Sequence, residues 1–330
     1  MQDNHERIQE KFRRELGEAL YGALQNPSVT ELMLNEDGTV WLDTFDGMVS
    51  YSTLSPLQAH NLIRTVASIA GVEVHVRSPD IAAELRLVMD SQVKTFRFQG
   101  LIPPVVSAPV FAIRKPASRV FELGDYVTRG MMTPHQQRHL TGAILARQNI
   151  LVVGGTGSGK TTLCNALLQE IATRFPRDRT AIIEDTLELQ CRVPNKIQLR
   201  SCETRSMNDL LRVCMRLRPD RIIIGEVRGK EAHALIKAWN TGHPGGVSTI
   251  HANDALRGLW RVAQLVEEAG VRASHEAIAE AINQVVFITR DASHPAGRRV
   301  TQLLAVHGYD RRTHQYDTTL VASETVSACA

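Results

Sequence analysis

Residues 150–172 read ILVVGGTGSGKTTLCNALLQEIA, and this stretch decides the class of fold. An apolar run over residues 150–153 is followed by the pattern G-x-x-x-x-G-K-[ST] and then by a helix-forming segment. Glycines allow successive backbone N–H groups to curl around a phosphate, and the start of the following helix adds a partial positive charge. The stretch therefore predicts a phosphate-binding loop between a buried strand and a helix.

The loop residues are the predicted contacts for a nucleoside triphosphate. They are Gly154, Gly155, Thr156, Gly157, Ser158, Gly159, Lys160 and Thr161. Lys160 is expected to reach the β- and γ-phosphates, and the Thr161 hydroxyl is expected to hold a Mg²⁺ ion. The alternative is a glycine-rich turn that binds no nucleotide, and the strand and helix on either side argue against it.

Two further apolar segments end in acidic residues. RIIIGE ends at Glu226, and AIIEDTLE carries Glu184, Asp185 and Glu188. Open α/β sheets bind ligands at the carboxyl ends of their strands, so these carboxylates are candidates to hold Mg²⁺ or orient water. Gly225 replaces the usual aspartate, which leaves the acidic role to Glu226. Each acidic end alone is more often merely solvated, but both beside a phosphate loop favour a hydrolytic site.

Another predicted strand, over residues 247–250, ends at His251. His251 is a candidate to contact the γ-phosphate through its neighbours. A lone histidine at a strand end is more often a hydrogen-bonded structural residue, and only the accompanying motifs favour the functional interpretation.

Length and composition limit the class of protein. The chain has 330 residues, 43% of them hydrophobic and 22% charged, which predicts two globular domains. The net charge of +3 is smaller than the basic excess expected of a dedicated nucleic-acid-binding protein. Five scattered cysteines without a C-x-x-C pair favour a reducing cytoplasm over a zinc or redox site. The charged N-terminus and the lack of a membrane-spanning apolar run predict a soluble protein that can still dock on a membrane complex.

Residues 1–115 are predicted to form a smaller α+β domain. Apolar residues at every fourth position predict one amphipathic helix over residues 4–24. Asp-Gly turns at 37–38 and 46–47 predict an antiparallel meander. The expected strands are 31–34, 40–43, 48–52, 81–89, 93–98 and 109–115, with a helix over 56–70 between the third and fourth strands.

The second domain is predicted over residues 133–330, after a linker at 116–132 that shows no sustained periodicity. Short apolar strands alternate with helices, which predicts an α/β domain with a mostly parallel sheet. The expected strands are 149–153, 180–184, 221–224 and 247–250, and the expected helices are 133–147, 160–172, 207–217 and 230–240. The last dozen residues are expected to be a loose tail.

Four motifs in order resemble the secretion ATPase superfamily. GGTGSGKTT, IIEDTLEL, RLRPDRIIIGEVRG and GGVSTIHAN resemble its Walker A, Asp box, Walker B and His box. RFQGLIPPVVSAPVFAIRKP resembles the type IV secretion branch, and the similarity extends from about residue 31 to about residue 290. The resemblance implies a hexameric ring of subunits, each with a PAS-like N-terminal domain, a RecA-like P-loop ATPase domain, and ATP bound between the two domains with Mg²⁺.

The resemblance also assigns roles to individual residues. The nucleotide is bound by Lys160, Thr161 and Thr162, and Mg²⁺ is held by Thr161, Glu184 and Asp185. The attacking water is polarised by Glu188 and Glu226. His251 is the His box residue. Arg97 and Arg114 match arginines with which the N-terminal domain of a neighbouring subunit contacts the nucleotide. A guanidinium suits the charge that develops on a transferred phosphoryl group. The alternative for each arginine is a surface ion pair.

Four more arginines surround the strand that ends at Glu226. Arg216, Arg218, Arg221 and Arg228 are candidates to face the next subunit. The sequence does not assign them individual roles.

The function predicted from the resemblance is that of an ATP hydrolase. It powers a type IV secretion or conjugative apparatus, in pilus assembly and substrate transfer, from the cytoplasmic face of the inner membrane. The expected partners are identical subunits, other ATPases and inner-membrane components. The alternatives are a type II secretion or type IV pilus ATPase, a small-molecule P-loop kinase, a non-catalytic nucleotide switch and a DNA helicase. Type II assembly ATPases usually carry a four-cysteine zinc module, whose spacing is missing here. Direct contact with nucleic acid is left open.

Overall fold

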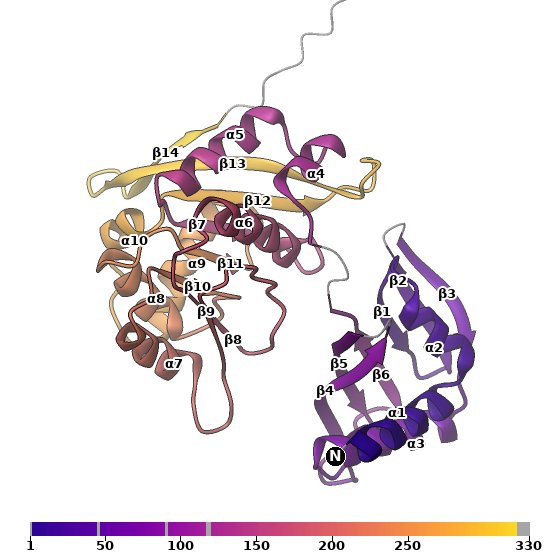
Figure 1. The fold of residues 1–330 in the computed structure, drawn as a ribbon. Coiled ribbons are helices and arrows are strands. Elements are labelled where there is room, and N and C mark those ends of the chain that lie inside the picture. The colour runs from indigo at the N-terminus through magenta and orange to yellow at the C-terminus, as the bar shows by residue number, and fades with distance from the viewer. Residues whose placement is uncertain (1, 45–46, 90–91, 117–119, 322–330) are drawn as a thin grey trace, which may run out of the picture. The chain divides into compact units, whose positions relative to one another are not determined.

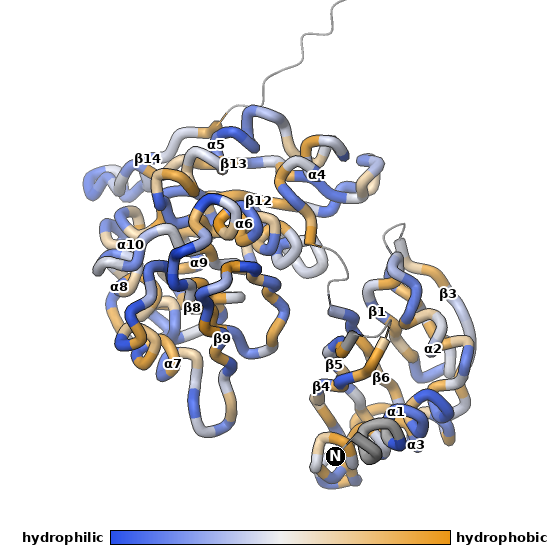
Figure 2. The backbone as a smooth tube through the Cα atoms, viewed as in Figure 1, coloured by the Kyte–Doolittle hydropathy of each residue, from blue (hydrophilic) through white to orange (hydrophobic). Residues whose placement is uncertain are grey.

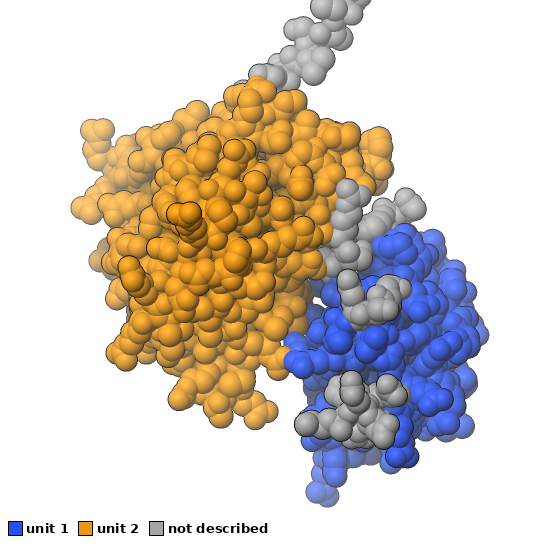
Figure 3. Space-filling view, viewed as in Figure 1, with its two compact units in different colours: residues 1–118 blue, residues 119–330 orange. Residues whose placement is uncertain are grey.

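The chain folds into two units, residues 1–118 and residues 119–330 (Figure 3). The computed structural model describes residues 2–44, 47–89, 92–116 and 120–321 (Figure 1). Each unit has its own hydrophobic core.

Unit 1 is an antiparallel sheet with three helices. Its helices are α1 (Gln2–Leu16), α2 (Glu18–Gln25) and α3 (Pro56–Ala70). Its strands are β1 (Val29–Leu34), β2 (Thr39–Thr44), β3 (Gly47–Thr53), β4 (Asp80–Met89), β5 (Gln92–Leu101) and β6 (Val110–Arg114). They lie in the order β3-β2-β1-β6-β5-β4, and every neighbouring pair is antiparallel. Alternate strand residues such as Leu32, Phe96 and Ile113 are buried in one core with Phe12 and Leu62 of the helices.

The predicted helix over residues 4–24 is broken at Gly17. This glycine has a φ of 84°, a backbone conformation that side-chain-bearing residues rarely adopt, and it separates α1 from α2. Phe12, Leu16, Leu20 and Leu24 are all buried. The four-residue spacing therefore identified the buried face correctly, but it could not detect the change in chain direction.

The first predicted Asp-Gly turn joins β1 to β2. Gly38 has a φ of 81°, and a Cβ atom there would lie 2.9 Å from the carbonyl oxygen of Leu54. Both the backbone conformation and the close approach require glycine. In the second predicted turn, Asp46 lies outside the described residues, and Gly47 begins β3.

Unit 2 is built on a mixed eight-stranded sheet. Its strands are β7 (Ile150–Val153), β8 (Thr180–Glu184), β9 (Lys196–Arg200), β10 (Arg221–Ile224), β11 (Val247–Ile250), β12 (Gln284–Arg290), β13 (Arg298–Asp310) and β14 (Gln315–Leu320). They lie in the order β14-β13-β12-β7-β11-β10-β8-β9. The strands from β12 to β9 are parallel, whereas β13 and β14 are antiparallel. The placement of β11 between β7 and β10 fits a RecA-like core.

Helices cover both faces of this sheet. They are α4 (Leu123–Thr128), α5 (Pro134–Leu145), α6 (Lys160–Arg174), α7 (Met207–Cys214), α8 (Glu231–Asn240), α9 (Ala255–Glu268) and α10 (His275–Ala281), with a 3₁₀ turn at Met215–Leu217. In β7, Ile150 and Val152 pack with α4, α5 and α6, whereas Leu151 and Val153 pack with α7 to α10. Burial on both faces explains the uninterrupted apolar sequence of β7. Figure 2 shows orange, hydrophobic stretches of backbone within this unit.

The stretch 116–132, predicted to be a linker, contains α4. Leu123, Tyr126, Met131 and Met132 are buried in the core of unit 2. A helix of six residues is too short to show a sustained period, so pattern analysis missed it. This stretch therefore belongs largely to the second unit.

The predicted tail is ordered at its beginning. Its first two residues, Thr319 and Leu320, belong to β14, which pairs with β13. Residues 322–330 lie outside the described part of the chain.

The helices of both units are short. Among the described residues, no helix has both the length and the apolar character needed to cross a membrane.

Candidate functional site

The phosphate-binding loop lies between β7 and α6, as predicted. Gly157 and Gly159 have φ values of 67° and 99°, which favour glycine. A Cβ atom on Gly154 would overlap the carbonyl oxygen of Ile288 in β12. Gly159 is the N-cap of α6, so the first N–H groups of this helix have no carbonyl partner within the helix. The loop therefore has the geometry of an anion site at a helix N-terminus.

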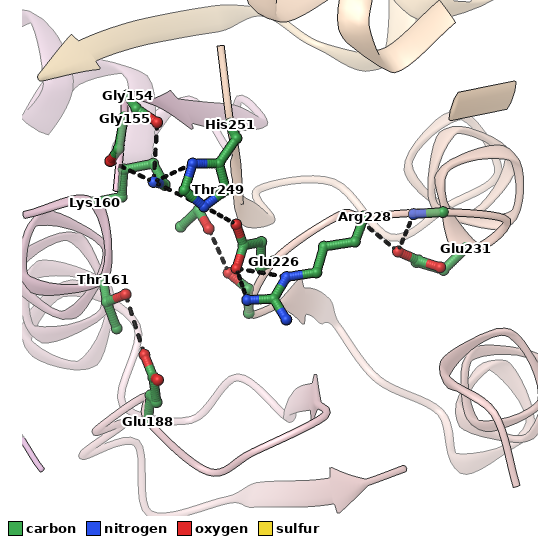
Figure 4. Close-up of polar contacts among 12 residues, drawn as sticks. Gly154, Gly155, Lys160, Thr161, Glu188, Glu226, Arg228, Glu231, Thr249 and His251 are labelled. Atoms are coloured by element: carbon green, nitrogen blue, oxygen red, sulfur yellow. Dashed lines mark hydrogen bonds and ion pairs between the residues drawn. The ribbon is translucent and has the colours of Figure 1, made fainter. Parts of the chain in front are cut away.

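Lys160 is the central cation of this loop. It is only 7% exposed, and its Nζ donates to the carbonyl oxygens of Gly154 and Gly155 over 2.9 Å each. The imidazole of His251 lies beside it, with Nδ1 3.2 Å and Nε2 3.4 Å from Nζ (Figure 4). The ends of β7 and β11 meet because the two strands are paired in parallel.

Glu226 lies on the other side of His251. Its Oε1 is 2.6 Å from His251 Nε2, and its Oε2 accepts a hydrogen bond from Arg228 Nε over 2.8 Å (Figure 4). Arg228 Nη2 contacts the same oxygen. Burial lowers the pKa of Arg228, but the hydrogen bond and charge of Glu226, together with the charges of Asp185 and Glu188, raise that pKa overall. The structure therefore brings Lys160, His251 and Glu226 into one chain of contacts.

Gly225 leaves space for Glu184. A Cβ atom on Gly225 would lie 2.8 Å from Glu184 Cγ and 3.2 Å from its Oε1. Glu184 is buried, and its Oε1 accepts the backbone N–H groups of Glu188 and Leu189 over 2.9 Å each. The absence of the usual aspartate therefore has a steric reason, since Glu184 occupies the adjoining space and holds the loop that carries Glu188.

The Gly225 position provides a stability prediction. Gly225→Ala is expected to lower the free energy of unfolding by about 1–3 kcal/mol, because the new methyl group must displace a buried side chain. Thermal unfolding measures the loss, and Gly229→Ala is the control, since its nearest neighbour would be at an ordinary 3.5 Å. Equal unfolding temperatures for the two variants would contradict the steric explanation.

Thr161 and Glu188 provide oxygen donors next to the loop. Thr161 Oγ1 donates to Glu188 Oε2 over 3.3 Å (Figure 4). Asp185 is exposed and accepts a hydrogen bond from Ser201 Oγ over 2.6 Å. No group of three or more His, Cys, Asp and Glu side chains that could hold a metal lies within the described residues. A hydroxyl and a carboxylate nevertheless fit Mg²⁺, which takes few protein ligands when a substrate supplies phosphate oxygens.

Arg97 and Arg114 lie directly opposite each other in unit 1. The register pairs Arg97 of β5 with Arg114 of β6, and the same row continues to Glu84 of β4 and Glu31 of β1. Arg114 is exposed and Arg97 is half-buried. Like charges on directly opposed residues destabilise a sheet, and a bound anion would offset this repulsion. Glu84 and Glu31 are also placed to form ion pairs with the two arginines.

The match to a protein-family model decides the classification. Residues 18–329 match the family described as type II/IV secretion system protein. The chain belongs to this family. The conjugal transfer protein TrbB of Rhizobium radiobacter is 44% identical over 316 residues, which cover 96% of this chain and 94% of the relative. A probable TrbB of Sinorhizobium fredii is 42% identical over 322 residues, covering 97% and 96%.

A solved structure supports the fold of this secretion system protein. The ATPase DotB of Legionella pneumophila aligns with a TM-score of 0.60 at 16% identity, covering 90% of this chain and 77% of DotB. At this identity the likeness concerns the fold alone. The predicted resemblance to secretion ATPases of the type IV branch is confirmed by the family match and the TrbB relatives.

Arg221 of this secretion system protein does not face outward, so its predicted place at a subunit surface is wrong. Its side chain is fully buried, and Nε donates to Asp178 Oδ2 over 2.8 Å. Nη1 donates to the carbonyl oxygen of Gly245, also over 2.8 Å. Burial lowers the pKa of Arg221, and Asp178 opposes this effect. The reason is that β10 is an interior strand with both faces covered. Arg216 and Arg218 are exposed.

Sequence reasoning missed several residues that support the site. Thr249 Oγ1 donates to the carbonyl oxygen of Gly225 over 2.8 Å, and Asn165 Oδ1 accepts the N–H of Gln190 over 2.8 Å. Arg290 Nε donates to the carbonyl oxygen of Gly157 over 3.0 Å. The run VVFITR, which ends at Arg290, is an apolar strand with a charged end and was therefore a usable signal.

Proposed function

We propose that this chain is an ATP hydrolase that powers a type IV secretion apparatus of the conjugative kind, in pilus assembly and substrate transfer. The observation that carries the proposal is the convergence of Lys160, His251 and Glu226 at a phosphate-binding loop (Figure 4). The nature of the apparatus comes from relatives named as conjugal transfer proteins, which align over nearly the whole chain.

The phosphates of ATP bind to the loop and to Lys160. The backbone N–H groups at the start of α6 and the Lys160 ammonium offset the phosphate charge. The proposed nucleotide contacts also include Thr156 and Ser158 of the loop and Thr162 of α6. His251 lies within hydrogen-bonding distance of Lys160 and is suited to contact the γ-phosphate.

Glu226 is the proposed general base, because it lies with Lys160 and His251 rather than with Thr161. Its carboxylate takes the proton of the attacking water, while Glu188 lies on the side of Thr161. Mg²⁺, when bound by Thr161 and Glu188, supplies charge neutralisation at the phosphates. The predicted ligand Glu184 is buried and accepts the backbone N–H groups of Glu188 and Leu189, so we assign it the role of positioning the Glu188 loop. We assign Asp185, which accepts a hydrogen bond from Ser201, the role of fixing the start of that loop.

Arg97 and Arg114 in unit 1 of a neighbouring subunit are proposed to contact the nucleotide phosphates. Two guanidinium groups on opposed residues suit the charge of a transferred phosphoryl group. The proposal also includes a hexameric ring, a PAS-like unit 1, ATP-driven motion of the two units, and docking on other ATPases and inner-membrane components at the cytoplasmic face.

Arg114→Ala tests the role of unit 1. We expect at least a 10-fold loss of turnover with the unfolding temperature unchanged, because arginine fingers contribute on the order of 10³ or more to phosphoryl transfer. ATP hydrolysis is measured with Mg-ATP, and the oligomer mass is measured both with and without it. Arg86→Ala is the matched control, since Arg86 is exposed in the same sheet and pairs with Thr95. Equal turnover in both variants would remove Arg114 from the reaction.

The same measurements separate the alternative functions. A ring that hydrolyses ATP supports the motor. A monomer that phosphorylates a small acceptor would identify a kinase, and ATP binding without turnover would identify a nucleotide switch. Either of these two results would overturn the proposal.

A further inference from the structure

Two arginines from the β12–β13 hairpin lie against the phosphate-binding loop. Arg290 ends β12, and its Nε donates to the carbonyl oxygen of Gly157 over 3.0 Å. Arg298 begins β13, and its Nη1 lies 3.1 Å from the position that a Cβ atom would take on Gly159. Both therefore come from a segment more than 120 residues beyond the loop in the chain.

The packing between Arg290 and the loop requires glycine. A Cβ atom on Gly157 would overlap Arg290 Nη2 and would lie 2.9 Å from its Cζ. Gly157 also has a positive φ of 67°. This glycine therefore serves two purposes, since it allows the loop to turn and it allows the guanidinium to lie directly against the backbone.

The two arginines are paired in register. Arg290 is directly opposite Arg298 in the antiparallel ladder of β12 and β13. Like charges in this arrangement repel each other and destabilise the hairpin. The acid that follows Arg290, Asp291, forms an ion pair with Arg299 over 2.8 Å. A phosphate group bound in the loop would offset the repulsion, because guanidinium groups and phosphates attract each other strongly.

We propose that Arg290 and Arg298 are positioning residues for nucleoside di- and triphosphates, acting on the phosphate-binding loop from the β12–β13 hairpin. Arg290 holds the Gly157 carbonyl, so that the N–H groups of the loop are kept available for phosphate. Both guanidinium groups add positive potential. This inference rests on the proposed function and deepens it, since it makes the C-terminal hairpin part of nucleotide binding.

The expected effect is on affinity more than on turnover. The loop binds the phosphates of substrate and transition state alike, and the loss of such uniform binding raises KM and leaves kcat nearly unchanged. For Arg290→Ala we expect Kd for ADP and KM for ATP to rise about 10-fold, because the loop loses the hydrogen bond that positions it and the site loses one positive charge near the phosphates. Arg298→Ala should act in the same direction, and Arg290→Lys should recover part of the loss.

The experiment uses the full-length chain. The Kd of a fluorescent ADP analogue and the steady-state kinetics with Mg-ATP are measured for the wild type, Arg290→Ala, Arg290→Lys, Arg298→Ala and Lys160→Ala. Arg299→Ala is the matched control, because Arg299 adjoins Arg298 but pairs with Asp291. The control is expected to bind like the wild type. If Arg290→Ala does not fold, Arg290→Lys provides the test. A Kd between the wild-type value and that of Lys160→Ala supports the inference. A Kd equal to the wild-type value overturns it.

Failure of this inference can be distinguished from failure of the proposed function. Wild-type affinity in Arg290→Ala and Arg298→Ala, together with weak binding in Lys160→Ala, would overturn the inference alone. Wild-type affinity in Lys160→Ala as well would overturn the nucleotide site itself. An equal loss in Arg299→Ala would also overturn the inference, because the effect would then reflect general surface charge.

Discussion

Replacing Glu226 with glutamine is expected to remove ATP turnover while leaving nucleotide binding intact. Glutamine keeps the size of the side chain, and its carbonyl oxygen can still accept a hydrogen bond from Arg228. It cannot take a proton from water. Loss of a general base costs about 10²- to 10⁴-fold in rate, so kcat should fall by at least about 10²-fold. Single-turnover hydrolysis and ADP binding are the measurements.

Glu188→Gln is the informative comparison for this variant. Glu188 contacts Thr161, so its loss is expected to raise the Mg²⁺ concentration that gives half-maximal turnover. Glu203→Gln, at an exposed position, is the control for a change of charge alone. If Glu188→Gln abolished turnover at saturating Mg²⁺ and Glu226→Gln retained it, Glu188 and not Glu226 would be the general base.

The largest effect on stability is expected for Asp178→Ala. Asp178 accepts hydrogen bonds from Arg221 and Arg147, both over 2.8 Å, and Arg221 is fully buried. Removing the carboxylate leaves a buried positive charge without its counter-ion. Breaking a buried pair in this way costs about 3–5 kcal/mol. For a domain of this size, that corresponds to a fall on the order of 10 °C in the unfolding temperature.

Differential scanning calorimetry of the full chain measures this loss. Arg174→Ala is the matched control, since Arg174 forms an exposed ion pair with Glu170 over 3.0 Å. Such surface pairs are worth about 0–1 kcal/mol, so the control should unfold close to the wild type. Equal shifts in the two variants would show that the buried cluster does not stabilise unit 2.

The candidate site was predictable where it depends on strand ends. Glu226 and His251 each follow an apolar run, and parallel strands end at one edge of a sheet. That rule was sufficient to predict that they would meet near Lys160. The rule does not give side-chain partners, and the contact of Glu226 with Arg228 depends on the conformation of a loop.

Elements with weak or short patterns were not predictable. The six-residue helix α4 has no measurable period. Strands β12 to β14 lie beyond the last of the four motifs and were not predicted, although the apolar run of β12 could have indicated a strand. In the sequence, nothing distinguishes Arg221 from the three other arginines around the strand that precedes Glu226. Only the packing of helices on both faces of β10 shows that Arg221 is buried, while Arg216 and Arg218 are exposed.

The sequence by itself determined the phosphate-binding loop, the buried strands β7, β8, β10 and β11, and the family, because these depend on residue order over short stretches and on backbone conformations that only glycine readily adopts. The tertiary structure alone decided three further contacts. Glu184 fills the space beside Gly225, Arg221 pairs with Asp178, and Arg290 lies against Gly157. Each of these contacts joins segments far apart in the chain, so each depends on strand order and register, which local pattern does not encode.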